Sequence, residues 1–259
     1  MIDPKQLLST PLRRNIAAAL GMLIVVGVGL ALYLRGAPTD AGSNVFDRGE
    51  RKAVESIVRA YILDHPEIIP EAINALQTRE VTKMLDSNRE AIETPYGSAW
   101  AGAKDGDVTL VEFFDYNCPY CRVSYPDVQR MLKEDPKLRI VYRDFPVLGP
   151  ASDEAALASL SAARQGRYTA FYGRSFTAPG RPDHERTIQM IRAAGLNEMR
   201  TAREMNSAAL KAEIKKNLDL GRALGLTGTP SYVVGNRILS GAVGYDELKK
   251  AVAEARLAR

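Results

Sequence analysis

The sequence has 259 residues, 46% hydrophobic and 25% charged, which are the proportions of a globular protein with a buried core and exclude disorder or low complexity as its description. Of the net charge of +4, +3 lies in residues 1–36, so the other 223 residues carry only +1 and give no indication of nucleic-acid binding. Two cysteines and two histidines argue against a four-ligand zinc cluster and exclude a dense disulfide framework.

Residues 15–34 form an uncharged run of 20 residues. A helix of this length spans about 30 Å, the thickness of a bilayer core, so the run predicts a transmembrane anchor. The alternative is a cleaved signal peptide, although its apolar region is usually only about 7–15 residues long. Because three basic residues precede the run and Arg35 follows it, we expect residues 1–14 in the cytoplasm and the rest outside. This predicts a single-pass protein of the bacterial inner (cytoplasmic) membrane whose main domain faces the periplasm, where thiols are not kept reduced.

Residues 37–45 are a polar linker, and residues 46–92 have the pattern of two helices. Residues 64–67, Asp-His-Pro-Glu, combine signals for the end of one helix and the start of the next. Such a segment cannot bury its apolar stripes alone, so we expect it either to pack on the main domain or to form a homo-oligomer. The stripes consist of Val54, Ile57, Val58, Tyr61, Ile62, Ile69, Ile73 and Leu76.

The pattern changes to that of an α/β domain over residues 98–259. A continuous apolar run predicts a buried strand, and the helix and strand after it complete a βαβ unit with parallel strands. The order of the later elements is unlike that of a Rossmann or ferredoxin-like fold. The predicted elements are strands at 108–114 and 138–142 with a helix at 119–133 between them, a helical block at 151–224, strands at 231–234 and 237–239, and a helix at 245–257.

The motif Cys118-Pro119-Tyr120-Cys121 directly follows the first predicted strand and opens a helix. Unpaired N–H groups and the partial positive charge of the helix N-terminus favour the Cys118 thiolate, the attacking species in thiol–disulfide exchange. We therefore predict that Cys118 attacks the substrate and that Cys121, one turn deeper, resolves the mixed disulfide. Two alternatives stay open: a structural disulfide, although so short a loop stabilises little, and a pair of thiolates that holds a metal such as Cu(I).

A second motif, Gly228-Thr229-Pro230, opens a later strand. Proline in sheets is confined to edges and strand starts, so Pro230 is a candidate cis-proline. This signal is weak alone and becomes specific in combination with a CxxC motif at a strand–helix junction.

The two motifs resemble those of the DsbA-like thioredoxin-fold oxidoreductases, with the resemblance extending over residues 98–259. It implies a thioredoxin fold with a helical insertion at about 151–224 and the activity of a protein disulfide oxidoreductase or isomerase. The implied partners are unfolded or misoxidised secreted proteins and a membrane redox partner, with no cofactor and no metal. Residues 61–69 resemble the N-terminal segment of suppressor-of-copper-sensitivity C (ScsC) relatives, some of which oligomerise through their N-terminal helices. The stretches that carry the resemblance are Val111–Cys121, Thr229-Pro230 and Ser240-Gly241.

Glu112 falls on the same strand face as Leu110 and Phe114, where burial would raise the pKa of its carboxyl group. The family has a buried acid six positions before the first cysteine, so the resemblance implies that Glu112 exchanges a proton with Cys121. The alternative is an acid at a strand edge that reaches solvent.

Thr229 should face the sulfur of Cys118 and pair with the substrate backbone, and Pro119, Tyr120 and Pro230 complete the predicted substrate-binding set. In the family, threonine before the cis-proline is more frequent in isomerases and reductases than in the strongest oxidases. Tyr120 also replaces the histidine of the prototypical oxidase, and a neutral phenol supports a thiolate less than an imidazolium does. Both departures indicate a milder oxidant, and the direction, oxidase or isomerase, stays open.

Several other residues have weaker signals. Trp100 and Tyr116 either line a substrate groove or pack in the core. Arg122 and Arg143 either tune the thiolate or are solvated, as exposed arginines usually are. The histidines, His65 and His184, are expected at the surface or at helix caps. A function of another class, a copper-binding or chaperone-like thiol module without redox turnover, remains the alternative.

Overall fold

The computed structural model describes residues 47–180 and 183–258. The chain divides into two units, residues 1–69 and 70–259. The predicted cytoplasmic segment at 1–14, the anchor at 15–34 and the linker at 37–45 lie outside the described residues. Within the described ranges no helix combines the length and the apolar character that crossing a bilayer requires.

Helix α2 (Arg48–Asp64) begins with a complete capping box. The Asp47 carboxylate accepts hydrogen bonds from the N–H groups of Gly49 and Glu50, and the Glu50 carboxylate accepts one from the Asp47 N–H. The helix ends at His65, whose N–H donates to the carbonyl of Tyr61. Ile62 is partly buried, and the other five large apolar residues of α2 are 43–69% exposed, so most of its apolar surface is uncovered in the described chain. These residues are Val54, Ile57, Val58, Tyr61 and Leu63.

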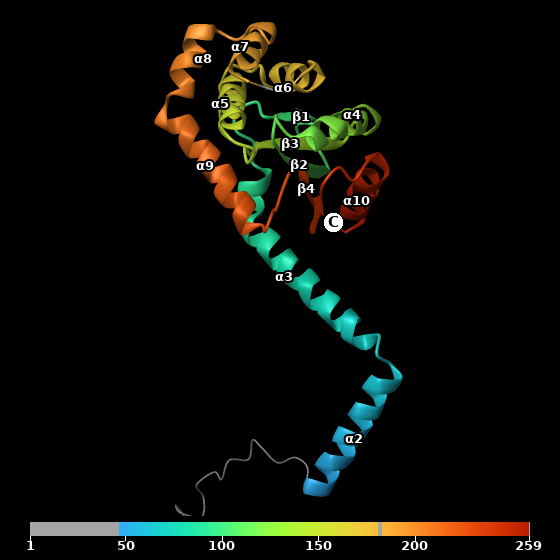
Figure 1. The fold of residues 1–259 in the computed structure, drawn as a ribbon. Coiled ribbons are helices and arrows are strands. Elements are labelled where there is room, and N and C mark those ends of the chain that lie inside the picture. Colours follow the sequence, from blue (N-terminus) through green and yellow to red (C-terminus); the bar gives the residue numbers. More distant parts are fainter. Residues whose placement is uncertain (1–46, 181–182, 259) are drawn as a thin grey trace, which may run out of the picture. The chain divides into compact units, whose positions relative to one another are not determined.

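Helix α3 (Ile68–Glu93) is continuous, and its two halves differ in burial. Ile73 and Leu76 in the first half are 50% and 59% exposed, whereas Leu85 and Ile92 in the second half are fully buried. Figure 1 shows the second half against the sheet and the first half extending away from it. The second half of α3 therefore packs on the main domain.

The second unit is built on a five-stranded sheet in the order β1-β3-β2-β4-β5. Strands β2 and β3 are parallel, and every other neighbouring pair is antiparallel. The sequence did not predict β1, because three residues are too few to show an alternation. The strands are β1 (Trp100–Gly102), β2 (Val108–Phe114), β3 (Leu138–Asp144), β4 (Ser231–Val234) and β5 (Arg237–Ser240).

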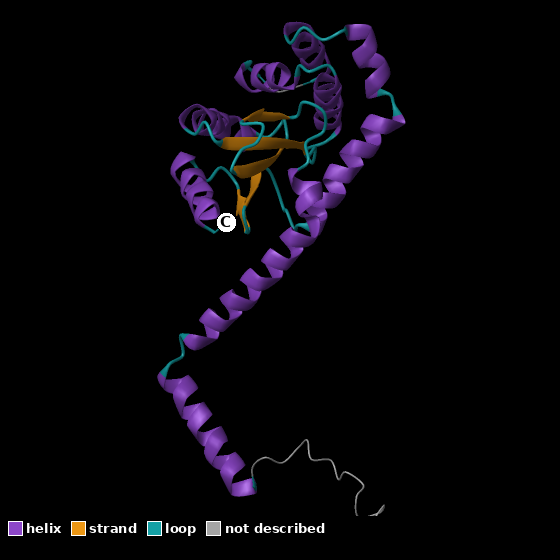
Figure 2. Cartoon of the chain, turned by 180° about the vertical axis from the view of Figure 1, so that it is seen from behind, coloured by secondary structure: helices purple, strands orange, loops and turns teal. Residues whose placement is uncertain are grey.

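Helices cover both faces of this sheet (Figure 2). The predicted helical block forms α5 to α9, between β3 and β4, and α4, α10 and most of α3 complete the unit. The helix bounds are α4 (Pro119–Glu134), α5 (Pro150–Arg164), α6 (Tyr168–Thr177), α7 (His184–Ala193), α8 (Glu198–Met205), α9 (Ala208–Ala223) and α10 (Tyr245–Leu257).

The alternation of β2 divides the core into two layers. Leu110 and Phe114 join a cluster with residues of α4, α5, α6, α7 and α10. Val111 and Phe113 face the opposite way and pack against residues of α3 and α9. Each fully buried side chain of this kind stabilises the fold by about 1.5–3 kcal/mol. Strand β2 is thus fixed from both sides, and this places the turn that follows it, where the CxxC motif begins.

Candidate active site

The CxxC motif lies at the start of α4, as its sequence context predicts. Cys118 is the N-cap, with an extended backbone (φ −77°, ψ 119°), and Pro119 occupies the first turn, where its missing N–H costs no hydrogen bond. The N–H of Cys118 donates to the carbonyl of Asp115 at 3.0 Å. Cys118 is 5% exposed and Cys121 is 1% exposed, so the first sulfur is the more accessible.

The two thiols have opposite acidities. Hydrogen bonding from the Cys121 thiol, assisted by Thr229 and by backbone N–H groups of Cys121 and Tyr120, lowers the pKa of Cys118 to about 5 against the effect of burial. Burial raises the pKa of Cys121 well above its usual value. At neutral pH the pair therefore consists of a thiolate at Cys118 and a protonated thiol at Cys121, the state in which Cys118 can attack a disulfide.

The loop before β4 lies beside this sulfur. The Thr229-Pro230 peptide bond is cis, as predicted for Pro230. The Cys118 Sγ lies 3.1 Å from the carbonyl oxygen of Thr229, and the Ser231 hydroxyl donates to the carbonyl of Gly228 at 2.8 Å. Residues 111 positions apart in the sequence thus meet at one point.

Glu112 is completely buried on the central strand β2, so the alternative of an acid at a strand edge that reaches solvent is wrong. The Tyr172 hydroxyl donates to Glu112 Oε2 at 2.7 Å, and Oε1 has no hydrogen-bond partner in the described part of the chain. Burial raises the pKa of Glu112 to about 7. The Glu112 charge also raises the pKa of Cys121, which favours the protonated form of that thiol.

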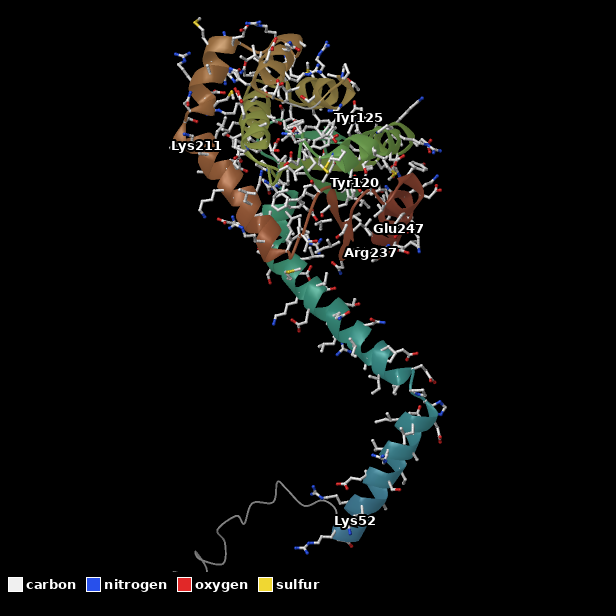
Figure 3. All side chains as sticks on the ribbon, in the orientation of Figure 1. Lys52, Tyr120, Tyr125, Lys211, Arg237 and Glu247 are labelled. Carbon is white, nitrogen blue, oxygen red and sulfur yellow. The ribbon has the colours of Figure 1, made fainter. Side chains whose placement is uncertain are left out.

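A groove of about 590 Å³ opens beside Cys118, and Pro119, Val123 and Leu148 line it. Val123 and Leu148 are 66% and 48% exposed. Tyr120, which Figure 3 labels near the start of α4, is 64% exposed. An exposed apolar surface around a nucleophile can hold apolar side chains of a polypeptide. Pro119 and Tyr120 thus lie at the sulfur, while their predicted contact with substrate stays a prediction.

Arg122 lines the groove beside Cys118, and its guanidinium is hydrogen-bonded to backbone carbonyls, so the expectation of a simply solvated arginine is wrong. An effect of Arg122 on the thiolate stays a prediction. Its Nη1 donates to the carbonyls of Phe176 at 2.5 Å and Ala178 at 2.8 Å, and its Nη2 donates to Gly180 at 3.1 Å. A cation at the carbonyl end of a helix is favourable. Arg122 therefore ties α4, which begins at the CxxC motif, to the end of α6.

Arg143 is likewise misread as an exposed arginine, since it is 1% exposed on β3. Its guanidinium donates to the carbonyls of Ala91, Ile92 and Thr94 at the end of α3, and to Asn217 Oδ1 at 3.2 Å. It acts as a C-cap for α3 from another element. No local pattern in the sequence reveals either arginine's partners, because they lie 49 to 74 positions away.

Tyr116 both packs in the core and lines the groove: it is 2% exposed, and its hydroxyl lies 2.8 Å from Ser159 Oγ. Trp100 packs against the cluster between the sheet and α3 and α9. His65 and His184 are exposed and lie 3.3 Å and 2.6 Å from Glu67 and Glu154. In residues 47–180 and 183–258 no group of three or more His, Cys, Asp or Glu side chains is arranged to hold a metal ion.

Comparisons with known proteins agree with this geometry. Residues 109–253 match the DSBA-like thioredoxin domain family, and residues 50–81 match the copper resistance protein ScsC N-terminal domain. A thioredoxin-like oxidoreductase from Silicibacter pomeroyi DSS-3 is 39% identical, with a TM-score of 0.64, over 66% of this chain and 99% of that one. A linker-deletion mutant of Proteus mirabilis ScsC is 31% identical, with a TM-score of 0.65, over 84% and 99%.

Among curated proteins, the probable disulfide bond formation protein D of Bacillus anthracis is 25% identical over 58% of this chain and 75% of that protein. The Na(+)/H(+) antiporter NhaA 3 of Salinispora tropica is 28% identical over 60% of this chain, which spans only 24% of the antiporter. The predicted resemblances to the DsbA-like oxidoreductases and to the N-terminal segment of ScsC are thus confirmed. The thioredoxin-like α/β fold with its helical content is confirmed as well. The chain belongs to the DSBA-like thioredoxin domain family.

Proposed function

We propose that this chain is a membrane-anchored thiol:disulfide oxidoreductase that exchanges disulfides with secreted proteins through Cys118 and Cys121. The observation that carries the proposal is the sulfur of Cys118 at the N-terminus of α4, with its pKa lowered to about 5 and the Thr229 carbonyl 3.1 Å away. Family membership and the disulfide-forming relatives support the oxidoreductase class.

In the donor direction the protein starts with a Cys118–Cys121 disulfide. A substrate thiolate attacks Cys118 Sγ, the bond between the two cysteines breaks, and its electron pair leaves on Cys121, which takes a proton from Glu112. A second substrate thiolate then attacks the substrate sulfur of the mixed disulfide and releases Cys118 as a thiolate. The substrate loses two electrons to the CxxC pair, and its two thiol protons are released on ionisation. One proton restores Glu112, and the other goes to solvent.

In the opposite direction the Cys118 thiolate attacks a substrate disulfide and releases one substrate thiolate. Glu112 then accepts the proton of Cys121, and the Cys121 thiolate attacks Cys118 Sγ to release the second one. Isomerisation follows when another thiolate of the same substrate attacks the substrate sulfur of the mixed disulfide instead. A new substrate disulfide forms, and Cys118 leaves as a thiolate. The buried carboxyl of Glu112, with its pKa raised to about 7, suits both directions because it can give or take a proton near neutral pH.

The site of action that we propose is the periplasmic face of the inner membrane, with residues 15–34 as a single anchor. The uncharged run and the basic residues before it support this placement. A partner in the membrane would then restore the oxidised or reduced form of the CxxC pair after each turnover. The substrates in this setting are unfolded or misoxidised secreted proteins, whose apolar segments suit the groove beside Cys118.

The experiment that tests this function is equilibration of the full chain, in detergent, with glutathione buffers of known potential. A reduction potential of about −120 mV identifies a disulfide donor, and one of about −270 mV identifies a reductant or isomerase. We expect a value between these limits, because a neutral Tyr120 supports the thiolate less than an imidazolium would. A chain whose cysteines form no disulfide in any buffer, or that exchanges none with a polypeptide, would contradict the proposal.

A second candidate function is copper handling, which the match of residues 50–81 to a copper resistance protein domain favours. Two thiolates can hold Cu(I) without any redox turnover. This candidate predicts tight Cu(I) binding by the reduced full chain together with no exchange activity. Exchange that persists in the presence of a Cu(I) chelator excludes it.

We further propose that copies of the chain associate through the apolar side of α2. Its exposed Val54, Ile57 and Tyr61 support this, since burying each would contribute about 1.5–3 kcal/mol. We expect light scattering to give an oligomer for the full chain in detergent and a monomer for Ile57→Asp. Lys52→Asp, on the polar side of the same helix, is the matched control and should leave the oligomer intact. Equal molar masses for all three chains would contradict the association.

A further inference from the structure

Asp115 stands between the end of β2 and the CxxC motif, and it is 1% exposed. Both of its carboxylate oxygens accept hydrogen bonds from backbone N–H groups. Oδ1 accepts from Asn117 at 2.8 Å, and Oδ2 accepts from Val147 at 2.8 Å and from Leu148 at 3.0 Å. Hydrogen bonds to a carboxylate are roughly twice as strong as those between neutral groups. One buried side chain thus joins the turn before Cys118 to a loop 32 positions further along the chain.

The loop that Asp115 holds, residues 145–149, connects β3 to α5. Its backbone is anchored at a second point, where the Phe145 N–H donates to the carbonyl of Phe114 at 2.8 Å. The side chains of Val147 and Leu148 nevertheless point outward and are 45% and 48% exposed. Leu148 lines the groove beside Cys118. The backbone N–H groups of this loop are thus hydrogen-bonded to buried acceptors, while the side chains of Val147 and Leu148 form an apolar surface that faces outward.

The carboxylate of Asp115 has other partners than its backbone, whose carbonyl accepts from the Cys118 N–H and whose N–H lowers the pKa of Cys121. Its carboxylate binds the backbone of residues 117, 147 and 148, whereas the pKa of Cys118 is lowered by Cys121, Thr229 and the first backbone N–H groups of α4. Removal of the Oδ2 bridge should therefore change how a polypeptide binds more than how the sulfur reacts.

We propose that Asp115 is a positioning residue for substrate: it fixes the backbone of Val147 and Leu148 so that Leu148 forms an apolar wall beside the Cys118 sulfur. The wall receives an apolar side chain next to the reacting cysteine of an extended polypeptide. This inference rests on the proposed function of disulfide exchange.

The test variant is Asp115→Ser. A serine hydroxyl can still accept from the Asn117 N–H in a turn, but it is too short to reach the loop as well. With a peptide disulfide that carries leucine next to its cysteine, we expect KM to rise about tenfold at unchanged kcat. Exchange with glutathione disulfide and the Cys118 pKa, followed by thiolate absorbance at 240 nm, should stay at wild-type values.

Two further variants sharpen this test. Leu148→Ala removes the wall itself, and the double variant Asp115→Ser/Leu148→Ala should be no worse than Leu148→Ala alone, because both changes act through one contact. Asp153→Asn is the control for loss of a nearby negative charge and should leave KM unchanged, since its side chain is not bonded to Val147 or Leu148.

Three results would overturn the inference: a shifted Cys118 pKa in Asp115→Ser, an equal loss with the peptide and with glutathione disulfide, or effects that multiply in the double variant. If Asp115→Ser fails to fold, Leu148→Ala decides alone, because KM should then rise for the leucine-bearing peptide and not for a glycine-bearing one. A wild-type chain that exchanges with neither substrate contradicts the proposed function instead.

Discussion

Replacement of Cys118 by alanine should reduce disulfide exchange with polypeptides on the order of a thousandfold or more, because the attacking sulfur is lost. Cys118 is the more exposed cysteine and the one whose pKa is lowered to about 5, so Cys121 cannot take its place. The measurement is the rate at which the full chain reduces or reshuffles the disulfides of a denatured protein substrate. Retention of full activity by Cys118→Ala would contradict the mechanism.

Cys121→Ala is the matched variant, since it removes the other sulfur and keeps the nucleophile. We expect it to accumulate mixed disulfides between Cys118 and substrate, visible as adducts on a non-reducing gel and lost after reduction. The Cys121 thiol is the largest influence that lowers the pKa of Cys118, so the nucleophile of this variant should titrate at higher pH than in the wild type. Adducts that form equally in Cys118→Ala would place the attack elsewhere.

Glu112→Gln should stabilise the reduced protein by up to about 3 kcal/mol at pH 8 and by almost nothing at pH 4. The pKa of this buried carboxyl group rises from 4.5 to about 7 on folding. Between these values the folded protein binds more protons than the unfolded chain, so stability falls as the pH rises through this window. Glutamine stays neutral and still accepts the hydrogen bond of Tyr172. Denaturant unfolding at both pH values measures the difference.

The exposed acid Glu90 supplies the control, because Glu90→Gln should change the free energy of unfolding little at either pH. The same Glu112→Gln protein should resolve its mixed disulfides about a hundredfold more slowly, since no other group replaces the proton acceptor for Cys121. An equal gain in stability at pH 4 and pH 8 would show that folding does not raise the pKa of Glu112.

The parts of the site that the sequence predicts are those encoded by neighbouring residues. The apolar run of β2 predicts a buried strand, and its alternation places Glu112 on the face of Leu110 and Phe114. The Cys-Pro-Tyr-Cys spacing predicts two sulfurs at a helix start. Each of these signals depends on a period or on a spacing within one element.

The parts that the sequence does not predict depend on contacts between distant segments. Asp115 gives no signal as a single acid before the CxxC motif, because the N–H groups it binds belong to a loop after β3. The role of Arg122 follows from carbonyl groups of α6, which carry no information in their side chains. Strand β1 is defined by its pairing with β3 rather than by any pattern of its own.

The arginine that caps α3 determines where this protein can be divided into exchangeable modules. The guanidinium of Arg143 lies buried in the thioredoxin-fold unit, yet its acceptors at Ala91, Ile92 and Thr94 precede the first strand. A gene fusion joined between residues 94 and 100 would leave this buried charge without those three carbonyls, with Asn217 and Glu213 as its remaining partners. A designed fusion should therefore keep the last turns of α3 together with the thioredoxin-fold unit and place its junction upstream of Leu85.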